Sequence, residues 1–157
     1  MRRILIAVTV LAAAALMSPV HAQAVRDEIA LSRQEIQTER QAIVAANLQL
    51  FESEAAAFWP LYRAYRQDIE VLGDRMVKLM EDYAANYKTL TDDKASALLD
   101  ESLSIQGDEI KVMTKHAKKM RQALPAKTVA RFFQIENQLN HILRAQLADE
   151  IPLVKNK

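Results

Sequence analysis

The sequence predicts an all-α protein, and three observations carry this prediction. The chain has only 2 glycines in 157 residues, whereas sheets and phosphate-binding loops need glycine at their turns. Apolar residues recur in alternating steps of four and three through its middle. Three segments begin with a similar helix-start pattern. Together these features predict four helices, over residues 26–47, 53–88, 92–122 and 126–149.

Residues 1–22 have the pattern of a cleavable signal peptide. Two arginines precede an apolar run over residues 4–17, and Val20, His21 and Ala22 form a small-residue cleavage site. The run is shorter than the roughly 20 residues of a membrane span. We therefore expect export to the periplasm, with no stable membrane insertion after cleavage. An uncleaved signal anchor is the alternative.

The mature chain, residues 23–157, is predicted to form a single all-helical domain. It has no cysteine, which excludes disulfides, thiol catalysis and a lipid-modified N-terminal cysteine. The first helix carries isoleucines only at strict intervals of seven, Ile29, Ile36 and Ile43. We interpret it as a weakly packed arm or as an element of a dimer.

The second helix carries the clearest apolar stripe, with Ser53 as a possible N-cap. Pro60 is expected to kink or loosen this helix. Trp59 lies about 100° round the axis from the stripe, so that both a core position and an exposed position remain open. The stripe consists of Phe58, Tyr62, Tyr65, Ile69, Leu72, Met76, Leu79 and Tyr83.

The third and fourth helices have clear start signals. Thr91 is a predicted N-cap followed by two aspartates, and Pro125 suits the first turn of the fourth helix. Gly107 lies inside the third helix, where a bend is plausible because glycine costs about 1 kcal/mol relative to alanine. The predicted apolar positions are Leu99, Leu103, Gln106, Ile110, Met113, Ala117 and Met120, then Val129, Phe132, Leu139, Leu143 and Leu147.

The two middle helices should form a long antiparallel hairpin. A 36-residue helix is about 54 Å long, which exceeds the width of a compact domain of this size. The predicted molecule is therefore elongated, with a long seam that suits a second copy. The hairpin also brings the aromatic residues of 58–65 close to Phe132 and Phe133, about 70 residues away.

Charge is distributed unevenly along the hairpin. Residues 111–131 carry seven lysines and arginines and no acid, whereas acids concentrate over residues 92–101. One interpretation is that these charges complement the dipole of the third helix. The other is that the cations flank apolar residues on a binding face for loosely structured, partly acidic polypeptide.

The sequence argues against enzymes and nucleic-acid binding. Without Arg2 and Arg3 the net charge falls from +1 to near −1, so no bulk charge attracts nucleic acid. No nucleophile elbow, phosphate-binding loop or paired catalytic carboxylates occur. We expect no cofactor and no metal, although His116 and His141 leave a metal-responsive sensor as an alternative.

The leucines at the helix starts stand in motifs with a family resemblance. "LTDDK" contains Leu90 and Thr91, "LFESE" contains Leu50 and "LPAKT" contains Leu124. Together with the signal peptide and the absence of cysteine, they resemble the LTxxQ motifs of the Spy/CpxP group of periplasmic proteins, over residues 42–154. Lys94 stands where the group has glutamine, which suggests a divergent, uncharacterised branch. The resemblance implies a cradle-like antiparallel homodimer.

The resemblance also implies a function, that of an ATP-independent chaperone (holdase) or an envelope-stress adaptor. We expect the partners to be a second copy of the chain and partly unfolded proteins. A metal-responsive sensor and a purely structural dimeric protein are the alternatives. The residues expected to bind clients are Trp59, Arg63, Arg66, Lys115, Lys118, Lys119, Met120 and Arg131.

Overall fold

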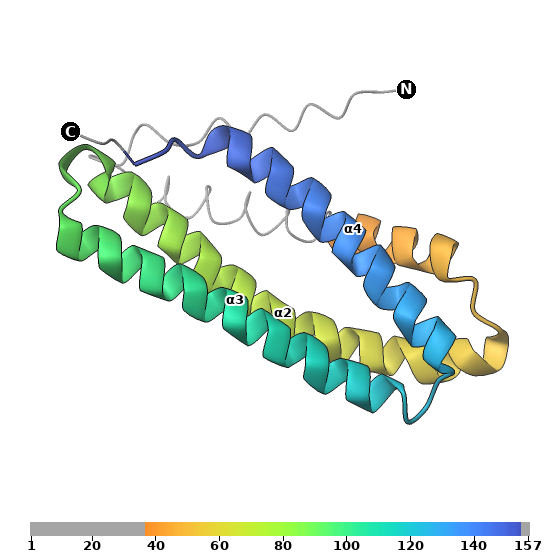
Figure 1. The fold of residues 1–157 in the computed structure, drawn as a ribbon. Coiled ribbons are helices and arrows are strands. Elements are labelled where there is room, and N and C mark those ends of the chain that lie inside the picture. The colour runs from red at the N-terminus through yellow and green to blue at the C-terminus, as the bar shows by residue number, and fades with distance from the viewer. Residues whose placement is uncertain (1–36, 155–157) are drawn as a thin grey trace, which may run out of the picture. The chain divides into compact units, whose positions relative to one another are not determined.

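Residues 37–154 fold entirely into helices and their connections. The computed structural model describes these residues, with the side chains of 146–150 excepted, and contains no strand within them. A helix over residues 37–48 is followed by α2 (Glu52–Asn86), the short 3-10 helix η1 (Tyr87–Thr89), α3 (Asp92–Met120) and α4 (Ala126–Glu150), as Figure 1 shows. The predicted all-α class is confirmed.

The chain divides into two units, Met1–Glu39 and Arg40–Lys157, and the contacts described below lie within the second. The predicted signal peptide, its cleavage site and the start of the first predicted helix, including Ile29 and Ile36, lie outside the described residues. None of the helices within residues 37–154 is both long enough and apolar enough to cross a membrane.

The helix-start predictions are confirmed at α3 and corrected at α2 and α4. Thr91 is the N-cap of α3, and its hydroxyl accepts a hydrogen bond from the Lys94 N–H at 3.3 Å. The N-cap of α2 is Phe51 and not Ser53, because the helix already begins at Glu52, two residues before a cap at Ser53 would allow. Its N–H donates to the Glu54 carboxylate at 3.2 Å. Pro125 is likewise the N-cap of α4 and precedes its first turn.

Replacing the N-cap of α3 gives a simple test of this assignment. We expect Thr91→Ala to lower the free energy of unfolding by about 1 kcal/mol, because the Lys94 N–H loses its acceptor. Ser53→Ala, which removes a hydroxyl from the first turn of α2, should change it by less than about 0.5 kcal/mol. Urea denaturation of both variants measures the difference, and equal losses would contradict the cap assignment.

Neither glycine serves at a connection between helices. Gly73 lies inside α2 and Gly107 inside α3. The chain instead leaves helix 37–48 through Gln49, whose φ of 53° is in the left-handed region usual for the residue after a helix. Pro60 does not end α2, which is continuous on both sides of it. Over residues 37–154, where the chain is almost entirely helical, the connections are therefore made without glycine.

Helices α2 and α3 lie side by side and form the predicted hairpin, connected through η1 (Figure 1). The stripe on α2 is confirmed where it buries Phe58, Tyr62, Tyr65 and Leu72. On α3 the prediction is largely wrong. Its buried residues are Ile105, His116 and Met120, whereas Leu99, Leu103 and Ile110 are exposed.

The reason for the error is the rotation of α3 about its own axis. At 100° per residue, Ile105 lies about 160° round the helix from Leu103. α3 therefore contacts α2 through a second, weaker row of apolar residues, and the predicted row is turned away from it. Toward its C-terminal end the predicted row does reach the core, where Met120 is buried and Met113 packs against it.

The core lies where α2 begins, α3 ends and α4 begins. The ring of Phe132 in α4 is 5.2 Å from that of Phe58 and 5.6 Å from that of Tyr65, between centroids. This confirms the expected meeting of segments about 70 residues apart. Val44 and Leu48 of helix 37–48 belong to the same core.

Helix α4 runs in the same direction as α2. Near its start it packs against the start of α2, and just beyond its end the Pro152 carbonyl accepts a hydrogen bond from the Tyr83 hydroxyl at 2.8 Å. Arg144 pairs with Glu109 of α3. These contacts place the turn between α3 and α4 at the same end as the aromatic core. The charged residues on either side of that turn therefore lie at this end too.

Candidate functional site

The end of α3 and the start of α4 carry a dense group of exposed cations, which we call the basic end. No acidic residue interrupts it, since the nearest acids along the chain are Glu109 before it and Glu136 after it. All of its charged side chains are exposed. The basic end consists of Lys111, Lys115, Lys118, Lys119, Arg121, Lys127 and Arg131.

Some of these cations have partners within the protein. Lys115 pairs with Asp68 of α2 at 2.8 Å, and Lys111 pairs with Asp108 at 2.9 Å. The Arg131 Nε donates to the Asn47 carbonyl at 2.8 Å. Among the described side chains, the four others make no ion pair. The unpaired cations of the basic end are Lys118, Lys119, Arg121 and Lys127.

Some of the expected client-binding residues are exposed, and others are buried or interact with other residues of the protein. Arg63, Lys118 and Lys119 are exposed. Arg66 is turned toward Glu136, at 3.5 Å, and is mostly buried. Met120 is 0% exposed, so it belongs to the core and cannot contact a client at the surface.

Trp59 is partly buried against the core. Its ring makes edge contacts with Phe58 at 5.0 Å and with Tyr62 at 5.5 Å between centroids. It also lies on a different face from the basic end. Trp59 is nine residues before Asp68 and thus about 180° round α2 from it, while Lys115 reaches Asp68. The expected residues therefore do not form one continuous surface.

Near the basic end lies an exposed aromatic residue whose role was not predicted from the sequence. Phe51, the N-cap of α2, is 77% exposed. Glu54 accepts hydrogen bonds from the Phe51 N–H and from the Thr128 hydroxyl at 3.1 Å. This bridge fixes the start of α2 beside the first turn of α4, where Lys127 lies. The signal available in the sequence was an apolar residue directly before a helix start.

His116, a buried residue of α3, contacts Asp68 of α2, the same residue that pairs with Lys115 of the basic end. The Nε2 of His116 is 2.8 Å from Asp68 Oδ2, and its ring contacts that of Tyr65. Hydrogen bonds from Lys115 and His116, in that order of effect, lower the pKa of Asp68 below its ordinary value. Asp68 is therefore held as a carboxylate that orients both partners, and its role was not predicted.

A second polar cluster lies inside the core. Glu136 of α4 is 0% exposed and accepts a hydrogen bond at 2.9 Å from Arg40, which is 5% exposed. The second amino group of Arg40 donates to Asn140 at 3.0 Å. The pKa of Tyr65 is raised by burial and then by the charge of Glu136. Glu136 interrupts the apolar spacing between Phe132 and Leu139, which is the only trace of this cluster in the sequence.

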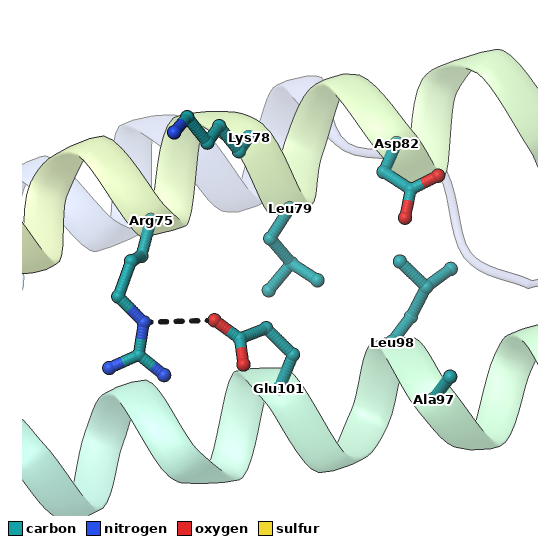
Figure 2. A pocket seen from close by; sticks show the side chains of 7 residues that line it. All are labelled: Arg75, Lys78, Leu79, Asp82, Ala97, Leu98 and Glu101. Carbon is teal, nitrogen blue, oxygen red and sulfur yellow. Dashed lines mark hydrogen bonds and ion pairs between the residues drawn. The ribbon is translucent and has the colours of Figure 1, made fainter.

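The far part of the hairpin contains an open pocket of about 200 Å³ between α2 and α3. Figure 2 shows Leu79 and Leu98 between the helices with charged side chains around them. Arg75 pairs with Glu101 at 2.9 Å and with Asp108 at 2.7 Å. Ion pairs of Arg75 with Glu101 and Asp108 therefore join α2 to α3 at this pocket.

In the part of the chain that the structure describes, no cluster of side chains supports metal binding. No group of three or more histidine, aspartate or glutamate side chains there is placed to hold an ion. The Nε2 of His116 is within hydrogen-bond distance of Asp68, and His141 is exposed.

Fold and site together define an all-helical protein with an exposed cationic end. Comparison of the chain with protein-family models, with curated proteins and with solved structures found no match of any of these three kinds.

Proposed function

We propose that the protein captures partly unfolded, partly acidic polypeptides at the basic end without nucleotide, as a periplasmic holdase or envelope-stress adaptor. The observation that carries the proposal is the continuous run of exposed cations over residues 111–131. Long-range attraction speeds the encounter with an acidic chain. Phe51 supplies an exposed apolar contact beside it.

The helix dipole accounts for only part of these charges. Lys118 and Lys119 lie in the last turn of α3, where cations are stabilised. Lys127, however, lies in the first turn of α4, where the dipole favours acids and none is present. Lys111 and Lys115 lie more than a turn before the end of α3, where the effect has faded. These two lysines are instead paired with Asp108 and Asp68. A partner with negative charge would account for Lys127, which makes no ion pair among the described side chains.

The proposal is tested by dilution of a chemically denatured, acidic client into buffer without nucleotide, with light scattering as the readout. We expect the protein to suppress aggregation near stoichiometric amounts. Reversing two charges, Lys119→Glu with Lys127→Glu, should slow capture roughly tenfold at low salt, because steering is lost. High salt should remove the difference between the variant and the unmodified protein.

Two matched variants sharpen this experiment. Lys78→Glu with Lys88→Glu makes the same change in net charge at exposed positions in the far part of the hairpin, and should leave capture unchanged. Phe51→Ser should weaken retention of the client without slowing the encounter. Normal aggregation of several clients in the presence of the protein, or equal effects of both double variants, would refute the assignment.

A further inference from the structure

Helix 37–48 packs against the rest of the protein through a narrow row of side chains. Its buried residues are Arg40, Val44 and Leu48, at steps of four, whereas residues 41–43 and 45–47 are exposed. Val44 and Leu48 belong to the aromatic core, and Arg40 donates to Glu136 at 2.9 Å. A helix of 12 residues is only marginally stable by itself in water, so that this helix depends on the contacts of its buried row.

The surface that this row covers belongs mainly to α4. Arg40 also donates to Asn140 at 3.0 Å, while Arg131 donates to the Asn47 carbonyl at 2.8 Å, so that helix 37–48 runs antiparallel beside α4 (Figure 1). We call the covered surface, with Glu136 and Asn140 beside the aromatic core, the α4 face. We propose that the α4 face is a binding site for an amphipathic helix of another protein, which displaces helix 37–48 from it.

The remaining core does not depend on helix 37–48. The ring of Phe132 in α4 contacts that of Phe58 in α2 directly, and the Thr128 hydroxyl donates to Glu54 across the same two helices. Helices α2 and α4 therefore stay joined when helix 37–48 leaves. Its release is a local opening, which costs less free energy than unfolding of the whole protein.

Glu136 indicates which helix the α4 face accepts. Its Oε2 lies 2.9 Å from Arg40 and 3.5 Å from Arg66, whereas its Oε1 is buried and makes no hydrogen bond within the described residues. A buried carboxylate oxygen without a donor is unfavourable, and an arginine that binds both oxygens would satisfy it. The preferred helix therefore carries an arginine, followed by aliphatic residues four and eight positions later that take the places of Val44 and Leu48.

Binding of a labelled peptide to the full chain tests the proposal. The probe is a fluorescein-labelled peptide of residues 37–51 with blocked ends, whose sequence has no net charge. Ala42→Gly with Ala45→Gly in the protein weakens helix 37–48 but keeps its whole buried row. Each glycine disfavours a helix about fivefold, so that the peptide should bind this variant roughly 20-fold more tightly than the unmodified protein. Fluorescence anisotropy measures both affinities.

A matched variant and a matched peptide serve as controls. Ala85→Gly with Ala97→Gly makes the same exchange at exposed alanines of α2 and α3, and should leave the peptide affinity at the level of the unmodified protein. A peptide with Arg40→Glu should bind at least tenfold more weakly, because it brings a second carboxylate to Glu136. Equal binding by the two double variants, or equal binding of the two peptides, would overturn the proposal.

Hydrogen exchange of the unmodified protein is the second measurement, and it needs no substitution. The backbone amides of residues 41–48 should exchange through local opening, at least tenfold faster than those at the buried positions of α2 and α4. Exchange of both groups at the same rate would mean that helix 37–48 leaves only when the protein unfolds, and would refute its displacement.

The α4 face and the basic end are separable in these experiments. Lys119→Glu with Lys127→Glu, which tests the basic end, should leave binding of the uncharged peptide unchanged. A protein that binds the peptide but captures no acidic client would refute the proposed function alone. A protein that captures clients but binds no peptide, even with Ala42→Gly and Ala45→Gly, would refute the α4 face alone.

Discussion

Glu136→Ala is expected to lower the free energy of unfolding by about 3–5 kcal/mol. The substitution leaves Arg40, which is 5% exposed, without its counter-charge inside the core. Arg66 loses the same partner but is closer to solvent, because its side chain is 20% exposed. The penalty therefore comes mainly from the desolvated guanidinium of Arg40. Urea denaturation, with the midpoint and slope fitted together, measures the loss.

A double variant separates the loss of the pair from the exposure of one charge. Arg40→Met with Glu136→Met replaces both buried ions by apolar side chains of similar length. It should recover much of the stability lost in Glu136→Ala, because no buried charge remains on either residue. A loss below about 1 kcal/mol in Glu136→Ala would show that Arg40 readily reaches water, and would contradict its buried role.

Phe132→Ala is expected to cost about 3–5 kcal/mol, through loss of transfer free energy and through the cavity left behind. The Phe132 ring is fully buried and contacts the rings of Phe58, Tyr62 and Tyr65, and so joins α4 to α2. No other side chain in the described core makes as many ring contacts across that interface.

The matched control is the same substitution at the exposed phenylalanine. Phe51→Ala should change stability by less than about 0.5 kcal/mol, since its side chain is 77% exposed. Thermal unfolding of the two variants by circular dichroism gives the comparison. Similar melting temperatures for the two variants would mean that the aromatic core does not hold α4 against α2.

Local signals predicted most of the fold. A hydroxyl before two aspartates identified Thr91 as a cap, and the spacing of aromatic residues identified the buried side of α2. These features act within a few residues along one helix. The spacing failed on α3, because two apolar rows compete there, one through Leu103 and one through Ile105. Periodicity alone does not indicate which row a neighbouring helix covers.

The candidate site was less predictable, for a related reason. The run of cations was visible in the sequence, but the pairing of Lys115 with Asp68 and of Arg66 with Glu136 was not. Pairing between helices depends on their relative rotation and axial shift, which no local pattern encodes. Met120 illustrates the consequence, since the sequence placed it both in the apolar row and among the client-binding residues, and the structure buries it in the core.

The part of the hairpin near η1 and the part near the aromatic core are stabilised by different interactions. Dissolved ions therefore affect the two parts unequally. Around Arg75 and Lys94 the helices are joined by solvent-accessible ion pairs with Glu101, Asp108 and Asp82. Such pairs weaken as ionic strength rises, whereas burial of aromatic surface does not. We therefore expect concentrated salt to loosen the η1 side of the protein first. The aromatic side should retain its packing and, in sulfate or phosphate, should pack more tightly.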